Sequence, residues 1–263
     1  MPPIIALLTD FGYRDAYVGT MKGVLLSRCP AARLVDLTHG VPPQDVTAGA
    51  LYLQAAAPYF PPDTIFLAVV DPGVGGERRP LCLRSGGRTF VGPDNGLLWP
   101  AAAALGRPEA FHLNRPEHWL PRVGCSFHGR DLFAPVAAAL ASGIPPGELG
   151  SPIADPVPLP LPEPRREGET IHGEVLLIDH YGNAITNLGP EHLGAPTPGA
   201  VRFEIGPLQL DGPATHYAAV PAGEPLVLLG SFNRYEVAVN GGSAAQRYGL
   251  TPGTPLTARQ RAG

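Results

Sequence analysis

Three polar residues of the N-terminal part each follow a predicted strand directly. Asp10 lies in LLTDFGYRDAYVG, His39 in LVDLTHG and Asp71 in LAVVDPGVGGERRP. In open α/β sheets ligands bind beyond the carboxyl ends of the strands, so we expect these side chains at one edge. Two carboxylates and an imidazole there can bind hydroxyl groups, accept a proton from water or hold a metal ion. Three such residues at one edge predict a functional site.

The segment after Asp71 combines a glycine-rich turn with two guanidinium groups, Arg78 and Arg79. The simplest interpretation is a tight turn with a solvated carboxylate. The alternative is a turn that lets a ligand approach the backbone while an arginine folds back toward Asp71. His128, in CSFHGRDLFAPVAAAL, is a further candidate at the start of a predicted helix, although a histidine there is more often structural.

The elements that would position these residues alternate between strands and helices. Short apolar runs predict strands over residues 4–8, 33–37 and 64–70, and a hairpin over 80–91. Helical spacing of apolar residues predicts helices over 15–28, 45–57, 95–105 and 130–141. This alternation predicts an α/β fold in which helices cover both faces of a mostly parallel sheet.

The C-terminal part has a different pattern, with short strands, little helix and many Gly, Pro and Asn turns. The strands are predicted over 174–178, 184–188, 201–205, 226–229 and 235–239. Such a series is typical of a small antiparallel β domain, and we expect a barrel-like one.

A proline-rich segment separates the two parts. Six of the thirteen residues from Pro152 to Pro164 are proline, which favours a stiff, extended conformation. We therefore predict an N-terminal domain over 1–152, a linker over 153–170 and a C-terminal domain over 171–263.

The composition excludes several classes of partner. Only 16% of the 263 residues are charged and the net charge is −4, which argues against nucleic acid or an anionic membrane as partner. No apolar run reaches the roughly 18 residues of a membrane span, and no signal peptide is recognisable. The three cysteines, Cys29, Cys82 and Cys125, lie far apart, which favours a reducing cytoplasm.

Six motifs follow one another along the chain: TDFG..D.YVG.MKG (9–23), VDPGVG..RR (70–79), PDNGLL (93–98), FHGRD.FAP.AA (127–138), IDHYGN..TN (178–187) and GSFNRYEVAVNGGSAA (230–245). Together they resemble the S-adenosyl-L-methionine (SAM) hydroxide adenosyltransferases, also called SAM hydrolases, which are relatives of fluorinating and chlorinating enzymes. The resemblance runs nearly end to end. Six ordered motifs are far more specific than any one of them.

The resemblance implies that SAM and water react to give adenosine and L-methionine, with SAM as substrate and no separate cofactor. It also implies a homotrimer with sites between one subunit's N-terminal domain and its neighbour's C-terminal domain. The family's catalytic Asp, Arg and His correspond to Asp71, Arg78 and His128, with Arg79 as the neighbouring alternative to Arg78. The halogenases carry tyrosines at the positions of Asp71 and His128, so hydrolysis is the better interpretation. Either Asp71 or His128 would accept the proton of the attacking water.

Other positions correspond to the family's substrate-binding residues. Asp10 matches a carboxylate that binds both ribose hydroxyls, a task suited to a group with two acceptor oxygens. Asp15 and Asp179 match residues near the methionine ammonium group.

The C-terminal motifs supply the remaining correspondences. Asn183 and the backbone from Val239 to Gly241 match contacts to the adenine edge. Ser231 and Glu236 lie in the matching segment with less defined roles.

Two departures from the fluorinating enzyme limit the transfer of roles. Gln44 stands where that enzyme stacks a tryptophan on adenine, and Phe232 stands where it has an arginine. Adenine stacking and carboxylate binding must therefore be made differently, with Tyr181 and Tyr217 as candidates.

Two other functions are compatible with the same residues. A metal-dependent hydrolase would use Asp10, His39, Asp71 and His128 as ligands, although no HxH, HxD or HExxH spacing supports a metal site. A non-enzymatic SAM or adenosine sensor would use the same pocket, but mere binding has no use for a water-positioning Asp, Arg and His.

Overall fold

A computed structural model describes residues 1–194 and 196–260 of the chain. It divides into two compact units, Met1–Pro160 and Leu161–Gly263. The first unit contains helices and a sheet, and the second consists mainly of strands, as the sequence predicts. The predicted domain boundaries themselves stay a prediction.

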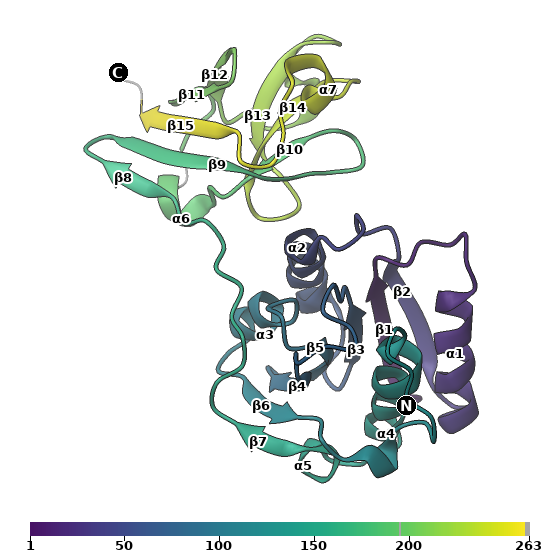
Figure 1. Cartoon of the computed structure of the whole chain (residues 1–263). Coiled ribbons are helices and arrows are strands. Elements are labelled where there is room, and N and C mark those ends of the chain that lie inside the picture. Colours follow the sequence, from purple (N-terminus) through teal and green to yellow (C-terminus); the bar gives the residue numbers. More distant parts are fainter. Residues whose placement is uncertain (195, 261–263) are drawn as a thin grey trace. The chain divides into compact units, whose positions relative to one another are not determined.

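The N-terminal unit is built on one sheet of seven strands (Figure 1). The strands are β1 (Ile4–Thr9), β2 (Arg33–Thr38), β3 (Ile65–Val69), β4 (Pro80–Ser85), β5 (Arg88–Pro93), β6 (Glu109–His112) and β7 (Ser151–Ile153). Their order is β2-β1-β3-β5-β4-β6-β7. The pairings from β2 to β5 are parallel, and those among β5, β4, β6 and β7 are antiparallel. The α/β fold class is confirmed, with a mixed sheet.

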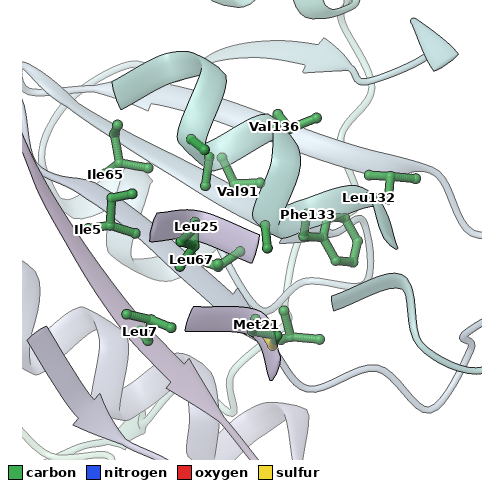
Figure 2. Close-up of a cluster of buried hydrophobic side chains, with 14 of the residues drawn as sticks. Ile5, Leu7, Met21, Leu25, Ile65, Leu67, Val91, Leu132, Phe133 and Val136 are labelled. Atoms are coloured by element: carbon green, nitrogen blue, oxygen red, sulfur yellow. The ribbon is translucent and has the colours of Figure 1, made fainter. Parts of the chain in front are cut away.

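Helices cover both faces of this sheet. They are α1 (Tyr17–Arg28), α2 (Val46–Ala56), α3 (Trp99–Ala104), α4 (Ala134–Ala141) and α5 (Pro146–Leu149), with 3₁₀ turns at Ala57–Tyr59 and Pro116–His118. Successive side chains of a strand point to opposite faces. Ile5 and Leu7 of β1 accordingly pack with Met21 and Leu25 of α1 and with residues of α4 (Figure 2). The alternate residues of β1 pack with residues of α2 and α3 in a second core.

Two predicted helices begin differently from expectation. The helix predicted over 95–105 begins only at Trp99, because Asn95 forms a turn in which its Nδ2 donates to the Val70 carbonyl and its Oδ1 accepts from the Leu97 N–H. The helix predicted over 130–141 starts with a π-helical turn, Gly129–Phe133, before α4. π-Helical turns are rare and occur frequently at functional sites.

The C-terminal unit is an antiparallel sheet of eight strands (Figure 1). The elements are β8 (Arg165–Glu167), β9 (Thr170–Ile178), β10 (Ala184–Thr186), β11 (Val201–Ile205), β12 (Leu208–Gly212), β13 (Pro225–Leu229), β14 (Tyr235–Val239), β15 (Pro255–Gln260), α6 (Pro190–Leu193), α7 (Ala244–Tyr248) and a 3₁₀ turn at Tyr217–Ala219. The order is β12-β11-β15-β9-β10-β14-β13, with β8 on β9. The Ala214 N–H, just beyond β12, donates to the Val227 carbonyl of β13 at 2.6 Å, which nearly closes the sheet into the predicted barrel.

The sequence missed several strands that lie at edges or follow turns. In the C-terminal unit these are β8, β12 and β15, and in the N-terminal unit β6 and β7. Each is short or rich in polar residues, so its apolar pattern is weak. None of the helices in the described part of the chain is long and apolar enough to cross a membrane.

Candidate functional site

A cavity of about 370 Å³ opens at the carboxyl edge of the parallel strands in the N-terminal unit. β1 and β3 are adjacent and in register, with Thr9 opposite Val69, so Asp10 and Asp71 emerge side by side. The cavity is lined by Asp10, Phe11, Tyr17, Pro43, Gln44, Val69, Asp71, Pro72, Val74, Ser126, Phe127, His128 and Gly129. The structure thus brings Asp10, Asp71 and His128 together around one space.

Arg78 joins Asp71 to His128. Its Nε lies 3.0 Å from each Asp71 carboxylate oxygen, and its Nη2 donates to Oδ2 and lies 2.8 Å from His128 Nδ1. The side chains of Asp71 and Arg78 are 5% and 11% exposed, so solvent weakens this ion pair little. The Arg78 guanidinium also lies over the Phe133 ring, 5.3 Å from its centre.

The glycine-rich turn makes this arrangement possible. Gly75 has φ +77°, a conformation that favours glycine, and a Cβ there would lie 2.2 Å from the Cys125 carbonyl oxygen. The turn after Asp71 therefore packs directly on the segment that leads to His128. A Cβ on Gly73 would approach Arg78 Cγ to 3.2 Å, which would crowd the folded-back side chain.

The adjacent arginines have different partners. Arg79 Nε donates to Asp94 at 2.8 Å, and its Nη1 donates to Asp155 at 3.0 Å. Asp94, which is buried, also accepts from the Val157 N–H at 2.7 Å. Arg78 is therefore the arginine beside Asp71, and Arg79 attaches the proline-rich segment to the N-terminal unit.

The contact with Arg78 determines which His128 nitrogen carries the proton. A guanidinium has only N–H donors, so Nδ1 must accept and the neutral ring carries its hydrogen on Nε2. Burial and the positive charge of Arg78 lower the pKa of His128 below 6.5, against weaker opposing effects of Asp71, Gly124 and Asp131. The imidazole is therefore neutral near pH 7, with its hydrogen on Nε2.

The π-helical turn that follows holds the His128 segment in place. Asp131, which is fully buried, accepts from the Gly124 N–H at 2.8 Å and from Arg130 Nε at 2.5 Å. Burial alone would raise the pKa of Asp131, but these hydrogen bonds lower it. The carboxylate thus ties the loop before His128 to the start of the helix.

Aromatic residues line one side of the cavity. Phe11, Tyr17 and Phe127 form three edge-to-face contacts with ring centres 5.2 to 5.9 Å apart. Sequence reasoning missed them, although each lies within a motif or beside a singled-out residue: Phe11 follows Asp10, and Phe127 precedes His128. That adjacency is the signal that could have identified them.

The other predicted N-terminal residues lie in different surroundings. Asp10 Oδ2 accepts from the Gln44 N–H at 2.8 Å. Asp15 is exposed in the segment before α1 and is not among the residues that line the cavity. His39 is 1% exposed and lies beneath the edge, so the expectation that it faces the site is wrong. Within residues 1–194 and 196–260, no three His, Cys, Asp or Glu side chains are grouped to hold a metal ion.

The C-terminal unit has a cavity of its own, of about 580 Å³. It is lined by Tyr181, Asn183, Tyr217, Val239, Gly241 and Gly242. Asp179 Oδ2 accepts from Asn183 Nδ2 at 2.9 Å, and its Oδ1 accepts from the Tyr181 and Asn183 N–H groups. Asp179 therefore fixes both the Asn183 amide and the turn that carries it.

Glu236 is buried beside this cavity. Its Oε1 accepts a 2.5 Å hydrogen bond from the Tyr217 hydroxyl. Burial raises the pKa of Glu236, Tyr217 opposes the rise, and Asp179 adds to it. Burial and Glu236 together raise the pKa of Tyr217. Ser231 is exposed in the turn before β14 and is not among the residues that line this cavity.

Comparison with protein families gives two matches that together span most of the chain. Residues 5–150 match the SAM hydroxide adenosyltransferase N-terminal domain, and residues 173–257 match the C-terminal domain of the same family.

Curated relatives and solved structures are similar over nearly the whole chain. The (R)-S-adenosyl-L-methionine hydrolase of Salinispora tropica is 44% identical, covering 97% of each chain. That of Thermus thermophilus is 43% identical, covering 96% of this chain and 98% of the relative. A fluorinase from Actinoplanes is 28% identical over 97% of both chains.

Two solved structures have the same fold. An uncharacterized conserved protein from Thermotoga maritima matches with a TM-score of 0.90 and 34% identity, covering 97% of this chain and all of that one. A conserved hypothetical protein from Thermus thermophilus matches with a TM-score of 0.79 and 41% identity, covering 99% of this chain and all of the other.

Proposed function

The chain belongs to the SAM hydroxide adenosyltransferase family, and we propose that it hydrolyses SAM to adenosine and L-methionine. Relatives at 42% to 44% identity over nearly the full length are named SAM hydrolases, so the chain is an enzyme of this kind. The observation that carries the mechanism is the Asp71–Arg78–His128 group, hydrogen-bonded together at the edge of a cavity that Asp10 also lines.

The reaction is a displacement at the C5′ carbon of SAM. The water oxygen forms a bond to C5′ while the C5′–sulfur bond breaks. The electron pair of the C5′–sulfur bond goes to sulfur. Because the leaving group is a sulfonium that departs as a neutral thioether, it needs no Lewis acid and no separate cofactor. The protein must hold water in line with C5′, about 3 Å away, and accept a proton.

We propose separate roles for the three residues, and the arrangement at His128 supports them. Because the Nδ1 lone pair of His128 is taken by Arg78, the ring offers its Nε2–H to the water oxygen as a donor. Asp71 lines the cavity, and its carboxylate oxygens retain lone pairs beyond the Arg78 contacts, so it accepts the water proton. Arg78 holds both residues in position. Asp71 is therefore the proposed base, and His128 the proposed hydrogen-bond donor.

The same charge distribution favours water over halide. A carboxylate at the nucleophile position repels an anion, whereas it can accept a hydrogen bond from water. The fluorinases are relatives of 27% to 29% identity, so the fold is shared while the nucleophile differs. In molar chloride we expect adenosine, with little or no chloroadenosine, on chromatography; a dominant chlorinated product would contradict the hydrolase assignment.

Substrate recognition is proposed to draw on both cavities. Asp10 would bind the ribose hydroxyls, Asn183 and the Val239–Gly241 backbone the adenine edge, and Asp15 and Asp179 the methionine ammonium group. The remaining candidates are Ser231 and Glu236. Tyr181 and Tyr217 line the cavity that contains Asn183, which supports the expectation that one of them stacks on adenine.

We propose that the assembly is a homotrimer in which the N-terminal cavity of one subunit and the C-terminal cavity of its neighbour form one site. In support, the ribose-binding and water-handling residues line one cavity and the adenine-binding residues the other. Mixing Asp71→Ala and Asn183→Ala chains should restore activity, since random exchange regenerates about a quarter of the sites. No recovery after confirmed subunit exchange would contradict shared sites.

A cytoplasmic location is part of the proposal. Cys29 and Cys82 are buried free thiols and Cys125 is an exposed one, as expected where disulfides do not form. The partners are then the small molecules of the reaction, with no nucleic acid or membrane.

The decisive experiment incubates the full chain with SAM in H₂¹⁸O and separates the products by chromatography and mass spectrometry. We expect equal amounts of adenosine and methionine, with the label on adenosine. Label on homoserine instead would place attack at a different carbon, and unchanged SAM would refute the function.

Two additions to this experiment sharpen it. Parallel reactions in EDTA test the metal-free mechanism, since loss of activity restored by a divalent metal would contradict it. The Asp71→Asn chain, purified identically, measures contaminating activity, and separate epimers of SAM test the (R) preference that the relatives' names state.

A further inference from the structure

Thr9 and His39 form a buried polar pair directly beneath the Asp10 turn. Thr9, the last residue of β1, is 0% exposed, and His39, which follows β2, is 1% exposed. Thr9 Oγ1 lies 2.7 Å from His39 Nδ1. Neither residue lines the cavity, yet the next two residues after Thr9, Asp10 and Phe11, both do. Polar groups are buried at a cost, so a pair this close to the site calls for a reason.

The direction of each hydrogen bond in this pair follows from its neighbours. His39 Nε2 lies 3.1 Å from Asp36 Oδ1, in imperfect alignment for a hydrogen bond, and the carboxylate favours a proton on that nitrogen. Burial lowers the pKa of His39, against the opposing effect of Asp36, so the ring is neutral. Nδ1 is then an acceptor, and the Thr9 hydroxyl must donate to it.

The far end of this arrangement is fixed by a cation. Lys22 Nζ of α1 donates to Asp36 Oδ2 at 2.7 Å, and these two side chains are partly exposed. Burial alone would raise the pKa of Asp36, but Lys22 and His39 together lower it, so it is a carboxylate. The series of polar contacts thus runs inward from Lys22 of α1, through Asp36 and His39, to Thr9 at the end of β1.

The near end holds the backbone of the turn. Thr9 Oγ1 accepts from the Phe11 N–H at 3.2 Å, and the His39 carbonyl accepts from the Gly12 N–H at 2.8 Å. Gly12 has φ +64°, so the turn adopts a conformation that L residues rarely take. Two N–H groups of the turn are therefore bound, that of Phe11 by the Thr9 hydroxyl and that of Gly12 by the His39 carbonyl.

We propose that Thr9 and His39 are positioning residues that hold the Asp10–Gly12 turn, and thereby place the Asp10 carboxylate for the ribose hydroxyls of SAM. This inference rests on the proposed function. Asp10 itself is held from the other side through Oδ2, by the Gln44 N–H. Since a misplaced binding group loses affinity steeply, the Asp10–Gly12 turn must be rigid.

The experiment compares Thr9→Val with Thr9→Ser in the full chain. Valine keeps the shape but removes the hydroxyl, whereas serine keeps both hydrogen bonds. We expect Thr9→Val to raise the KM for SAM about tenfold, the effect of losing a buried hydrogen bond, with kcat near the wild-type value. Thr9→Ser should restore the wild-type KM.

Thr64→Val is the matched control. Thr64 is 1% exposed and its hydroxyl donates to the Pro61 carbonyl at 2.9 Å, just before β3 begins and away from the cavity. Its loss should lower the melting temperature as Thr9→Val does but leave KM unchanged. An unchanged KM in Thr9→Val, or equal KM changes in Thr9→Val and Thr64→Val, would overturn the proposal.

Asp36→Ala provides a second route if Thr9→Val does not fold. Asp36 is partly exposed, so its removal is tolerable, and the proton on His39 is no longer held at Nε2. We expect a smaller rise in KM and, by ¹⁵N NMR of His39, a loss of the Nε2–H form. A wild-type KM with an altered tautomer would refute the positioning role. If the wild-type chain releases no adenosine at all, the proposed function fails, and calorimetric titration of adenosine into the same variants still tests the inference.

Discussion

The two cavities use carboxylates in opposite ways. In the N-terminal cavity Asp71 is paired with a guanidinium that also binds an imidazole. Beside the C-terminal cavity, Asp179 and Glu236 have only neutral partners in the contacts described, an amide, backbone N–H groups and a phenol. In the first cavity the Arg78 guanidinium compensates the negative charge of Asp71. Beside the second cavity Glu236 has no such cation among its described contacts, and burial raises its pKa.

This difference separates chemistry from recognition. A group that handles a water proton needs a fixed charge and a fixed direction, which Arg78 gives to both of its neighbours. A group that recognises a nucleoside or an amino acid needs a fixed shape and hydrogen-bond pattern, which neutral partners provide. We expect substitutions of Asp71 and His128 to change kcat, and substitutions in the second cavity to change affinity and stability.

The largest expected effect is that of Asp71→Asn. The amide keeps the size of the side chain but cannot accept the water proton, so kcat should fall by roughly 10²- to 10⁴-fold. Adenosine affinity, measured by calorimetry, should stay near the wild-type value, because the group acts in the transition state. Asp10→Ala is the contrasting control, with its loss mainly in affinity. Near-normal turnover with lost affinity in Asp71→Asn would make Asp71 a binding residue.

The next effect distinguishes the two possible roles of His128. His128→Ala removes the donor and should lower kcat by about 10²-fold, as loss of a positioned donor does. His128→Gln places an amide N–H near the Nε2 position and should recover a large part of that loss. A general base would be lost in both variants, so equal activity of the two would contradict the donor role. Combining either with Asp71→Asn should add little, because residues that act as a unit are not additive.

A smaller effect is expected in the pH dependence. Protonation of His128 puts a hydrogen on Nδ1, which faces the Arg78 guanidinium, so activity should be lost as the pH falls through the pKa of His128. Because burial and Arg78 lower that pKa, the loss should occur below pH 6.5. The measurement is kcat/KM against pH, and His128→Gln should lack this acidic limb. An unchanged limb in His128→Gln would assign it to another group.

The smallest effect concerns the stability of the C-terminal unit. Glu236 has a raised pKa in the folded state, so the native form binds the proton more readily than the unfolded form. Its unfavourable contribution is therefore absent at low pH and appears as the pH rises through the folded pKa. Glu236→Gln keeps an acceptor for Tyr217 and should raise the unfolding midpoint at pH 7 more than at pH 4. Equal changes at both pH values would contradict the raised pKa.

The sequence predicted much of the N-terminal site because adjacent parallel strands bring their ends together. The ends of β1 and β3 are in register, so the placement of Asp10 beside Asp71 follows from strand order alone. His39 follows the neighbouring strand, but the local bulge between Leu7 and Leu8 shifts the register of β2. That shift and the burial of Thr9 are tertiary details with no signal in a single sequence.

Other features depend on contacts far apart in the chain. Motif spacing favours Arg78 over its neighbour Arg79, and the contacts with Asp94 and Asp155 show that Arg79 faces away from Asp71. Asp131 of the π-helical turn accepts a hydrogen bond from Gly124, seven residues earlier. Neither the spacing of apolar residues nor local propensity reports such contacts, since both describe neighbours along one element.

The opposed partners of Arg78 and Arg79 have a consequence for how this loop can change over evolution. One arginine is bound to a residue just past β3, and the next to a residue just past β5 and to the proline-rich segment. A deletion within Val74–Glu77 would pull Arg79 toward the place of Arg78 and release Asp94 and Asp155. An insertion would do the reverse and leave Asp71 without its cation. The loop therefore tolerates substitution of the exposed Glu77 far better than any change in length, and its residue count is itself a property of the active site.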